Sequence, residues 1–259
     1  MHVPRRLLSL SCCVIVLAGA AALAQAPRVE PVDVNAAPGT FSILGYDPQT
    51  GEVGGAVQSS VFSVGSRNIW ADADAGAVVT QATVDVSYAP QSLALLKKGM
   101  APAAIVKQLW DNDPDPLPKV WSKNGRQFAV MNLKGEYAAF TGSISTPWAG
   151  HRGGKYCTAQ GNILTGEAVV NDMVAAFEKT TGHLSERLVA ALVAGQAAGG
   201  DKRGQQSAAM WIVKKGAGFW LNNDTVLRLQ VDDSKEPIKE LGRLVERWKV
   251  NRPKPLVER

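Results

Sequence analysis

The dipeptide Gly39-Thr40 opens a strand-like run that continues to Leu44, and it offers the most distinctive chemistry in the chain. If the chain were cut between these two residues, Thr40 would carry both a hydroxyl and a free α-amine. A free α-amine has a pKa of about 7.7–8.0 and can act as a general base near neutral pH. A threonine hydroxyl beside its own amine is an activated nucleophile. Taken alone, however, the dipeptide favours a simpler interpretation, a β-branched residue that begins a strand.

Other polar side chains interrupt the apolar strands that the pattern predicts. Ser59 ends one strand, Gln81 lies inside another, and Asn162 precedes an apolar pair and a helix. Burying an amide or a hydroxyl costs about 1–3 kcal/mol unless it is paired, so a set of such residues indicates a polar pocket. Each residue taken singly is more typical of a turn or a sheet edge. The full set comprises Gln58, Ser59, Thr80, Gln81, Gln160, Asn162, Asp201, Arg203, Gln205 and Gln206.

We expect neither a metal nor a cofactor. After an N-terminal leader is removed, only His151 and His183 remain, without partners at metal-ligand spacing. The glycines lack the strand–GxGxxG–helix context of a dinucleotide fold, and no GxSxG elbow supports a serine triad. Trp148 and His151 stand in a glycine-rich segment that can contact substrate. Asp201 and Arg203 can bind substrate or pair with each other.

Residues 1–24 have the pattern of a signal peptide. Arg5 and Arg6 form a basic start, an almost wholly apolar run follows, and small residues end it at Ala24. A second cleavage site ends at Ala26, where the following proline would hinder the cut. The leader therefore predicts an exported protein, periplasmic or secreted.

Composition and net charge limit the kinds of partner that the chain can bind. Of 28 basic residues, 26 remain after the two leader arginines are removed, and with 23 acidic residues they give a net charge of +3. The basic residues are scattered, which argues against a nucleic-acid surface. We expect no membrane partner once the leader is removed. The expected partner is a small amide or peptide-like substrate, and the sequence leaves open whether the chain forms a homo-oligomer.

After leader removal, Cys157 is the only cysteine in the chain, which excludes an internal disulfide. We expect it to be a half-buried strand residue rather than a nucleophile.

The apolar periodicity predicts an α+β fold with a regular order of elements: strands, two helices, strands, two helices, strands, helix. That order fits two antiparallel sheets packed face to face with helices outside. We expect a linker or propeptide at 25–39, a single domain at 40–250 and a tail at 251–259. Segment 142–155 is predicted to be a loop. Predicted strands are 40–46, 52–59, 76–83, 127–133, 136–141, 207–214 and 226–231, and predicted helices are 90–98, 102–110, 167–180, 185–196 and 236–248.

A series of ordered blocks carries a resemblance to a known family. They are TFSI at 40–43, DPQTGE at 47–52, AVQS at 56–59, GAVVTQA at 76–82, AFTG at 139–142, WAG at 148–150, AQGNIL at 159–164 and AAGGDKRGQQSA at 197–208. From about Thr40 to Val231, the chain resembles the DUF1028 family, an uncharacterised group placed among the N-terminal-nucleophile (Ntn) hydrolases.

The resemblance implies a four-layer αββα Ntn-hydrolase-like sandwich with Thr40 at the nucleophile position. Since Thr40 is internal here, a cut at Gly39-Thr40 would be needed. By analogy with Ntn enzymes, a backbone N–H near Gln81 or Ala82, or the Asn162 side chain, stabilises the oxyanion. The basic residue often found near Ntn nucleophiles has no lysine counterpart, and Arg203 is the nearest candidate.

The leading hypothesis is an exported amide hydrolase with Thr40, Gln81 and Asn162 as catalytic residues. The alternative is a catalytically inactive periplasmic protein that binds peptide or cell-wall fragments on the same fold. A transferase that passes the acyl group to an amine also stays open, since it shares the first half-reaction with hydrolysis. Candidate substrate-binding residues are Ser59, Trp148, His151, Asp201, Arg203 and Gln206.

Overall fold

The computed structural model describes residues 39–144 and 148–251. The predicted signal peptide, all of the predicted linker except Gly39, and all of the predicted tail except Asn251 lie outside the described residues. Within the described ranges the fold is α+β, with ten strands in two antiparallel sheets and five α-helices. The predicted class and the predicted order of elements are therefore confirmed.

Six strands form the first sheet, in the order β10-β9-β2-β1-β8-β7. β1 lies inside this sheet, and its first residue, Thr40, pairs with Ser59 on one side and Asn162 on the other. The pairing therefore brings three residues from distant parts of the chain to one end of the sheet. The strands are β1 Thr40–Tyr46, β2 Val53–Ser59, β7 Ala149–Gly154, β8 Cys157–Asn162, β9 Ser207–Val213 and β10 Thr225–Val231.

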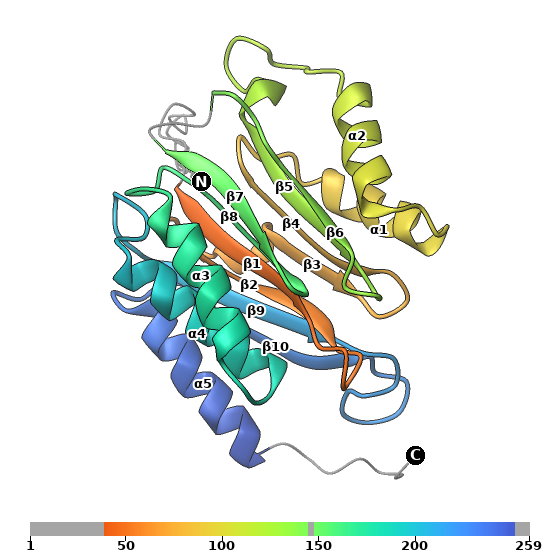
Figure 1. The fold of residues 1–259 in the computed structure, drawn as a ribbon, viewed down its shortest axis with the longest axis vertical. Coiled ribbons are helices and arrows are strands. Elements are labelled where there is room, and N and C mark those ends of the chain that lie inside the picture. Colours follow the sequence, from red (N-terminus) through yellow and green to blue (C-terminus); the bar gives the residue numbers. More distant parts are fainter. Residues whose placement is uncertain (1–38, 145–147, 252–259) are drawn as a thin grey trace, which may run out of the picture. The chain divides into compact units, whose positions relative to one another are not determined.

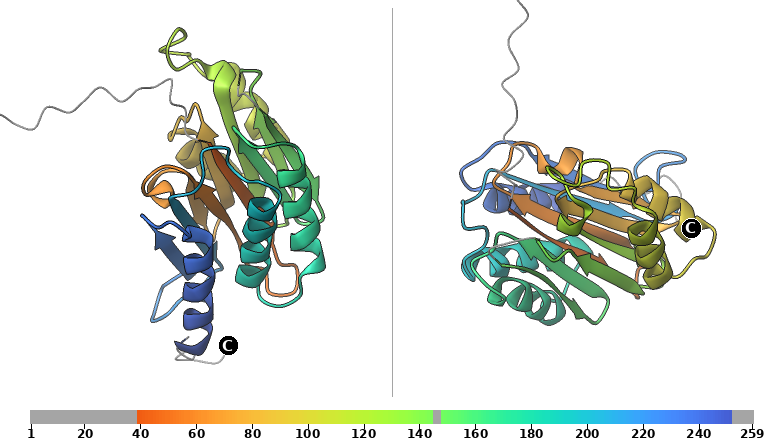
Figure 2. Two further views of the ribbon diagram at one scale, coloured as in Figure 1. Left: turned by 90° about the vertical axis from the view of Figure 1, so that its left-hand side faces the viewer. Right: turned by 90° about the horizontal axis from the view of Figure 1, so that it is seen from above.

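Four strands form the second sheet, in the order β3-β4-β5-β6. They are β3 Ile69–Asp72, β4 Gly76–Ala82, β5 Arg126–Asn132 and β6 Tyr137–Thr141. Helices α1 and α2 lie along this sheet, and α3, α4 and α5 lie along the first one (Figures 1 and 2). The helices are α1 Tyr88–Lys97, α2 Pro102–Asn112, α3 Ala168–Lys179, α4 Leu184–Ala197 and α5 Pro237–Asn251.

Because side chains alternate along a strand, one face of the first sheet contacts the helices and the other contacts the second sheet. In β1, Phe41 and Ile43 pack with the apolar residues of α3 and α4, whereas Leu44 belongs to a separate apolar cluster shared with the second sheet. Successive strand residues point to opposite faces, so Thr40 and Ser42 share the face of Leu44. Both therefore point toward the second sheet.

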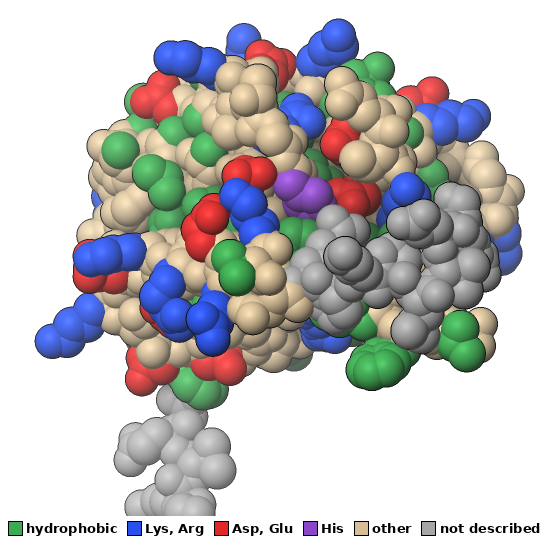
Figure 3. Space-filling view, turned by 90° about the horizontal axis from the view of Figure 1, so that it is seen from below, with side chains coloured by type: hydrophobic (Ala, Val, Ile, Leu, Met, Phe, Trp, Pro, Cys, Tyr) green, Lys and Arg blue, Asp and Glu red, His purple; other side chains and the backbone are tan. Residues whose placement is uncertain are grey.

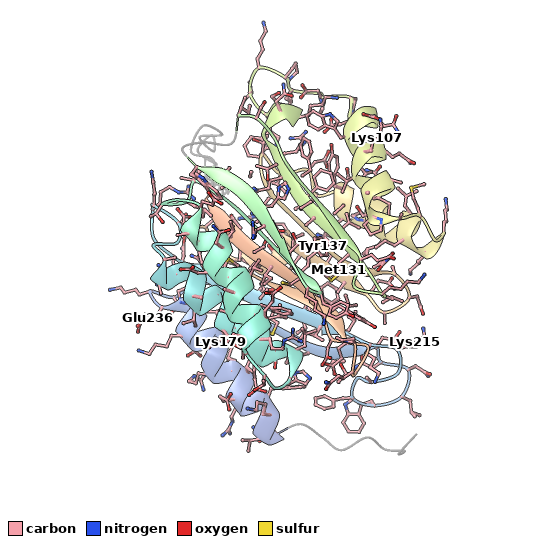
Figure 4. The ribbon with its side chains drawn as sticks, viewed as in Figure 1. Lys107, Met131, Tyr137, Lys179, Lys215 and Glu236 are labelled. Carbon is pink, nitrogen blue, oxygen red and sulfur yellow. The ribbon has the colours of Figure 1, made fainter. Side chains whose placement is uncertain are left out.

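The core between the sheets is apolar toward the end of β1. Met131 and Tyr137, which pair across β5 and β6, lie away from the start of β1, while Lys107 and Glu236 project outward (Figure 4). Fully burying one large apolar side chain contributes about 1.5–3 kcal/mol. This apolar half of the interface holds the sheets together and leaves the half near Thr40 to polar residues.

Segment 142–155 was predicted to be a loop, and this prediction is wrong where β7 occupies Ala149–Gly154. The strand sequence, AGHRGG, has little β propensity, and all of its residues are half-buried or exposed. Its pairing with β8 supplies backbone hydrogen bonds that need no particular side chains. An edge strand of this kind leaves almost no signal in the pattern of residue types. The short β3, Ile69–Asp72, was also missed.

A buried ion pair anchors the chain just beyond β4. Arg126 Nε donates to Asp113 Oδ2 at 3.1 Å, and its Nη1 donates to the Thr83 carbonyl at 2.9 Å. Burial opposes ionisation of Asp113. Hydrogen bonds from Tyr88 and the Asp115 N–H, together with the Arg126 guanidinium, outweigh it and hold the pKa of Asp113 below its ordinary value. The pair fixes the segment that directly follows Gln81 and Ala82.

Candidate functional site

Thr40 is 1% exposed, and its hydroxyl lies in a short hydrogen-bonded chain. Thr40 Oγ1 lies 2.9 Å from Ser59 Oγ, and Ser59 Oγ donates to the carbonyl oxygen of Gly39 at 2.6 Å. A serine hydroxyl has one proton to give, so the Thr40 hydroxyl is the donor in the first bond. One serine thus connects the predicted nucleophile to the carbonyl of the peptide bond that precedes it.

Two amides bind the carbonyl oxygen of Thr40. Gln81 Nε2 donates to it at 3.2 Å from β4, and Asn162 Nδ2 at 3.4 Å from β8. Both side chains are 1% exposed. Gln81 is followed by Ala82, whose φ of 62° lies in the left-handed region that few residues other than glycine adopt. The two amides therefore hold the Thr40 backbone, whereas the hydrogen-bond partner of its hydroxyl is Ser59.

Gln127, on β5, orients both amides. Its Oε1 accepts from Gln81 Nε2 at 2.7 Å and from Asn162 Nδ2 at 3.1 Å. Its Nε2 donates to the Gly161 and Gly150 carbonyls at 2.8 and 3.1 Å. Because Gln127 is itself fixed at both ends, the two amides keep their N–H groups turned toward Thr40.

Ser42 extends the same network along β1. Its hydroxyl donates to Gln81 Oε1 at 2.5 Å and accepts from Gln160 Nε2 at 2.7 Å. Two buried acceptors, Gln160 Oε1 and Asn162 Oδ1, have no hydrogen-bond partner among the described residues. Buried acceptors are rarely left unpaired in folded proteins. This end of the interface is thus rich in polar groups, and two of its acceptors are not paired with any described protein group.

Asp201 lies against Gly39 from the loop that follows α4. Its side chain is fully buried and forms an ion pair with Arg203, whose Nη2 lies 3.1 Å from Asp201 Oδ2. The backbone N–H of Arg203 also donates to Asp201 Oδ1 at 2.9 Å. Of the two roles open to this pair from the sequence, mutual pairing is therefore present.

Arg203 and Gln206 reach an open depression of about 410 Å³. The backbone N–H of Gln206 donates to the Ser59 carbonyl at 2.8 Å, and its Nε2 donates to Asp233 Oδ1 at 3.1 Å. The depression is therefore attached directly to the strand that carries Ser59. Its lining residues are Ser60, Arg203, Gln205, Gln206, Asp233, Ser234 and Lys235.

Trp148 and His151 have partners other than Thr40. Trp148 is half-buried and packs against the apolar core between the first sheet and its helices. His151 is exposed on β7, where its Nδ1 lies 3.0 Å from Thr141 Oγ1. Thr141 Oγ1 in turn accepts from Gln127 Nε2 at 3.0 Å. His151 thus joins the amide network only at its outer end.

The structure brings Thr40, Ser59, Gln81 and Asn162 together, with Asp201 close to Gly39. Thr80 and Gln58 also belonged to the predicted polar set, but they stay outside the network. Each is one position from a network residue on its strand, so its side chain points to the opposite face.

The sequence reasoning missed Ser42 and Gln127. Ser42 stands two positions after Thr40, and Gln127 opens a predicted strand. The period of two that places Thr40 and Leu44 on one face also includes Ser42. That signal was available from the sequence. Nothing in the sequence shows, however, that Gln127 faces Gln81, because the pairing of β4 with β5 is long-range.

Cys157 is fully buried on β8, more deeply than predicted. Burial, the main cause, raises the pKa of its thiol to about 12. The thiolate is the nucleophilic form of cysteine, so this side chain is inert near neutral pH, and the predicted structural role is supported.

The described surface mixes charges of both signs. On the face shown in Figure 3, basic and acidic side chains are interspersed, with apolar groups scattered between them. Across residues 39–144 and 148–251, no group of three or more His, Cys, Asp or Glu residues could hold a metal ion. No helix in those ranges is both long and apolar enough to cross a membrane.

The fold and the site define an α+β protein with a buried threonine at the start of an internal strand. The chain belongs to the DUF1028 family, a family of unknown function, whose profile matches residues 40–241. It is also similar to the protein SPO2555 from Silicibacter pomeroyi, a DUF1028 protein of known crystal structure. The two share 30% identity and a TM-score of 0.72, over 82% of this chain and 89% of that one. Comparison with curated proteins finds no match.

Proposed function

We propose that this protein is an exported hydrolase of a C–N bond, amide or peptide-like, that uses Thr40 as an N-terminal nucleophile. In this proposal the two sheets and their helices form a four-layer αββα sandwich of the Ntn-hydrolase kind. The observation that carries the proposal is the bridge from Thr40 Oγ1 through Ser59 Oγ to the Gly39 carbonyl, with bonds of 2.9 and 2.6 Å. The family profile, which begins at residue 40, supports the same boundary.

Activation begins with attack of Thr40 Oγ1 on the carbonyl carbon of Gly39. The Thr40 proton passes to Ser59 Oγ, while the proton of Ser59 passes to the Gly39 carbonyl oxygen. The tetrahedral adduct then breaks its C–N bond: its hydroxyl loses its proton, the leaving nitrogen of Thr40 gains one, and the carbonyl of an ester forms. Water hydrolyses the resulting ester, which frees the Gly39 carboxylate and restores the hydroxyl beside a new α-amine on Thr40.

Turnover repeats this chemistry on a substrate. The α-amine of Thr40 accepts the proton of its hydroxyl, and the hydroxyl oxygen attacks the substrate carbonyl. As the C–N bond breaks, the α-ammonium gives that proton to the leaving amine. Water then hydrolyses the acyl-enzyme and releases the acid. Ser59 takes the oxyanion role that it has toward Gly39, a contribution of about 3–4 kcal/mol for a well-placed donor. Gln81 and Asn162 hold the carbonyl of Thr40 and so fix the nucleophile against the substrate.

The test is the N-terminus and intact mass of the protein recovered from its exported compartment, followed by hydrolysis of a panel of amides. We expect a chain that begins at Thr40. The Thr40→Ala variant should keep its N-terminal segment and turn over no amide, whereas Thr40→Ser should still be processed. Ser92→Ala, which changes a buried serine on α1, is a control that should behave like wild type. An uncut chain, or undiminished turnover by Thr40→Ala, would contradict the mechanism.

The second candidate is a binding protein for peptide or cell-wall fragments that never cuts its chain. One observation favours it: Thr40 is 1% exposed while Gly39 is attached, yet the depression beside Ser60 and Arg203 is open to solvent. Calorimetric titration of the uncut Thr40→Ala variant with soluble cell-wall peptides tests this role. Micromolar binding together with an uncut wild-type chain would favour it over hydrolysis.

A further inference from the structure

The Cα atom of Gly39 lies directly against the carboxylate of Asp201. A Cβ atom placed on Gly39 would lie 2.5 Å from each carboxylate oxygen and 2.6 Å from Cγ. Real Cβ atoms essentially never approach other atoms so closely. Any L side chain at this position therefore requires Asp201 to move.

Asp201 is held firmly in its place. Its two oxygens accept from the Arg203 backbone N–H at 2.9 Å, from Nε at 3.3 Å and from Nη2 at 3.1 Å. Its backbone forms an isolated bridge with Leu164, at the end of the segment that carries Asn162. The carboxylate is fully buried although the Arg203 side chain is 34% exposed, so a shift would pull a buried charge away from its partner.

We infer that the mature site selects acyl groups without an L side chain at the α-carbon, and that Asp201 determines this preference. The inference rests on the proposed function, in which the Gly39 carbonyl occupies the place of the substrate carbonyl. Thr40 Oγ1 and Ser59 Oγ fix where that carbonyl must lie. The α-carbon of a substrate then falls near the Gly39 Cα. The substrate class is glycyl or acetyl amides.

The first experiment compares 4-nitroanilides of glycine, acetate and L-alanine with the chain that begins at Thr40. A misfit of one carbon in a closed pocket changes kcat/KM by about 10- to 200-fold, and we expect this preference for the glycyl over the L-alanyl amide. Asp201→Asn keeps the shape of the side chain and should keep the preference. Asp201→Gly removes the obstructing carboxylate and should reduce it.

The second experiment needs no amide substrate. Processing of the full chain is followed by intact mass for wild type, Gly39→Ala, Asp201→Gly and the double variant. We expect Gly39→Ala to slow the cut by at least about tenfold, and Asp201→Gly to restore part of the rate in the double variant. Near-ultraviolet circular dichroism shows whether each variant is folded before its rate is compared.

The outcomes separate the two proposals. Equal kcat/KM for the glycyl and L-alanyl amides, or a Gly39→Ala chain cut at the wild-type rate, overturns the role of Asp201 and leaves the hydrolase intact. A wild-type chain that is never cut and turns over no amide refutes the proposed function, and the selectivity falls with it.

Discussion

Replacing Gln127 by methionine should destabilise the fold and slow the proposed cut between Gly39 and Thr40. Methionine has a similar length and volume, so the change leaves no large cavity and removes only the amide. Gln81 Nε2 keeps its bond to the Thr40 carbonyl, and so does Asn162 Nδ2. The Gly161 carbonyl loses a buried partner.

The variant loses five hydrogen bonds of Gln127, three of them buried and two partly buried. At about 0.5–1.5 kcal/mol for each bond, the loss is about 3–7 kcal/mol. With a urea m-value of about 2–3 kcal/mol/M for a domain of this size, the denaturation midpoint should fall by about 1–3 M. Since Gln81 and Asn162 also lose the group that orients them, cutting at Gly39-Thr40 should slow as well. Intact mass against time measures that rate.

The matched control is Gln58→Met on β2. Gln58 is fully buried, but its Nε2 makes a single long bond of 3.4 Å, to the Gly204 carbonyl. We expect this control to cost less than about 1 kcal/mol and to leave processing unchanged. If Gln127→Met lowered the urea midpoint no more than Gln58→Met, the orienting role of Gln127 would be refuted.

Three further predictions concern stability and reactivity. Asp113→Asn should cost about 3 kcal/mol at pH 7, because Arg126 loses its buried charged partner. The lowered pKa of Asp113 means that its stabilisation is present above the unfolded value of about 3.9 and is lost as pH falls through the folded value. Urea midpoints of wild type and variant should therefore converge below about pH 4, and a constant gap would contradict this account. Cys157, with a pKa near 12, should resist iodoacetamide at pH 8 until the protein is unfolded, and mass spectrometry detects any earlier labelling. Gly45→Ala should lower the thermal midpoint at a cost of about 1–3 kcal/mol, since its Cβ would lie 2.7 Å from the Phe177 ring; an unchanged midpoint would show that the ring moves freely.

Much of the fold follows from local pattern. The β1–β2 hairpin is recognisable because Asp47 to Gly51 is turn chemistry between two apolar runs. The helices follow from their apolar spacing, and their predicted boundaries lie within a few residues of those in the structure. β7 was not predicted, because its stability comes from backbone pairing with β8, which leaves no signal in the sequence.

The residues of the candidate site could be predicted from the sequence only in part. Thr40, Ser59, Gln81 and Asn162 each interrupt or end an apolar strand, and such residues are visible one at a time. The role of Gln127 depends on its contacts with Gln81 and Asn162. These three residues lie on three strands that are far apart in the sequence. Those contacts depend on register and on the packing of one sheet against the other.

The fold does not require polar residues at the end of the inter-sheet interface near Thr40. β4 presents Gln81 to this interface and, two residues earlier, Val79. β5 presents Gln127 and, two residues later, Ala129. The same two sheets thus pack through apolar residues two positions away on each strand.

Apolar residues at the polar positions would avoid the desolvation of several amides, which is unfavourable even when they are paired. Since the fold does not need these amides, the physical reason to keep them lies in what they hold. Their bonds converge on the carbonyl of Thr40 and fix the residue whose hydroxyl reaches Gly39 through Ser59. The proposed mechanism needs that arrangement, because it requires the Thr40 hydroxyl to be aligned with the Gly39 carbonyl.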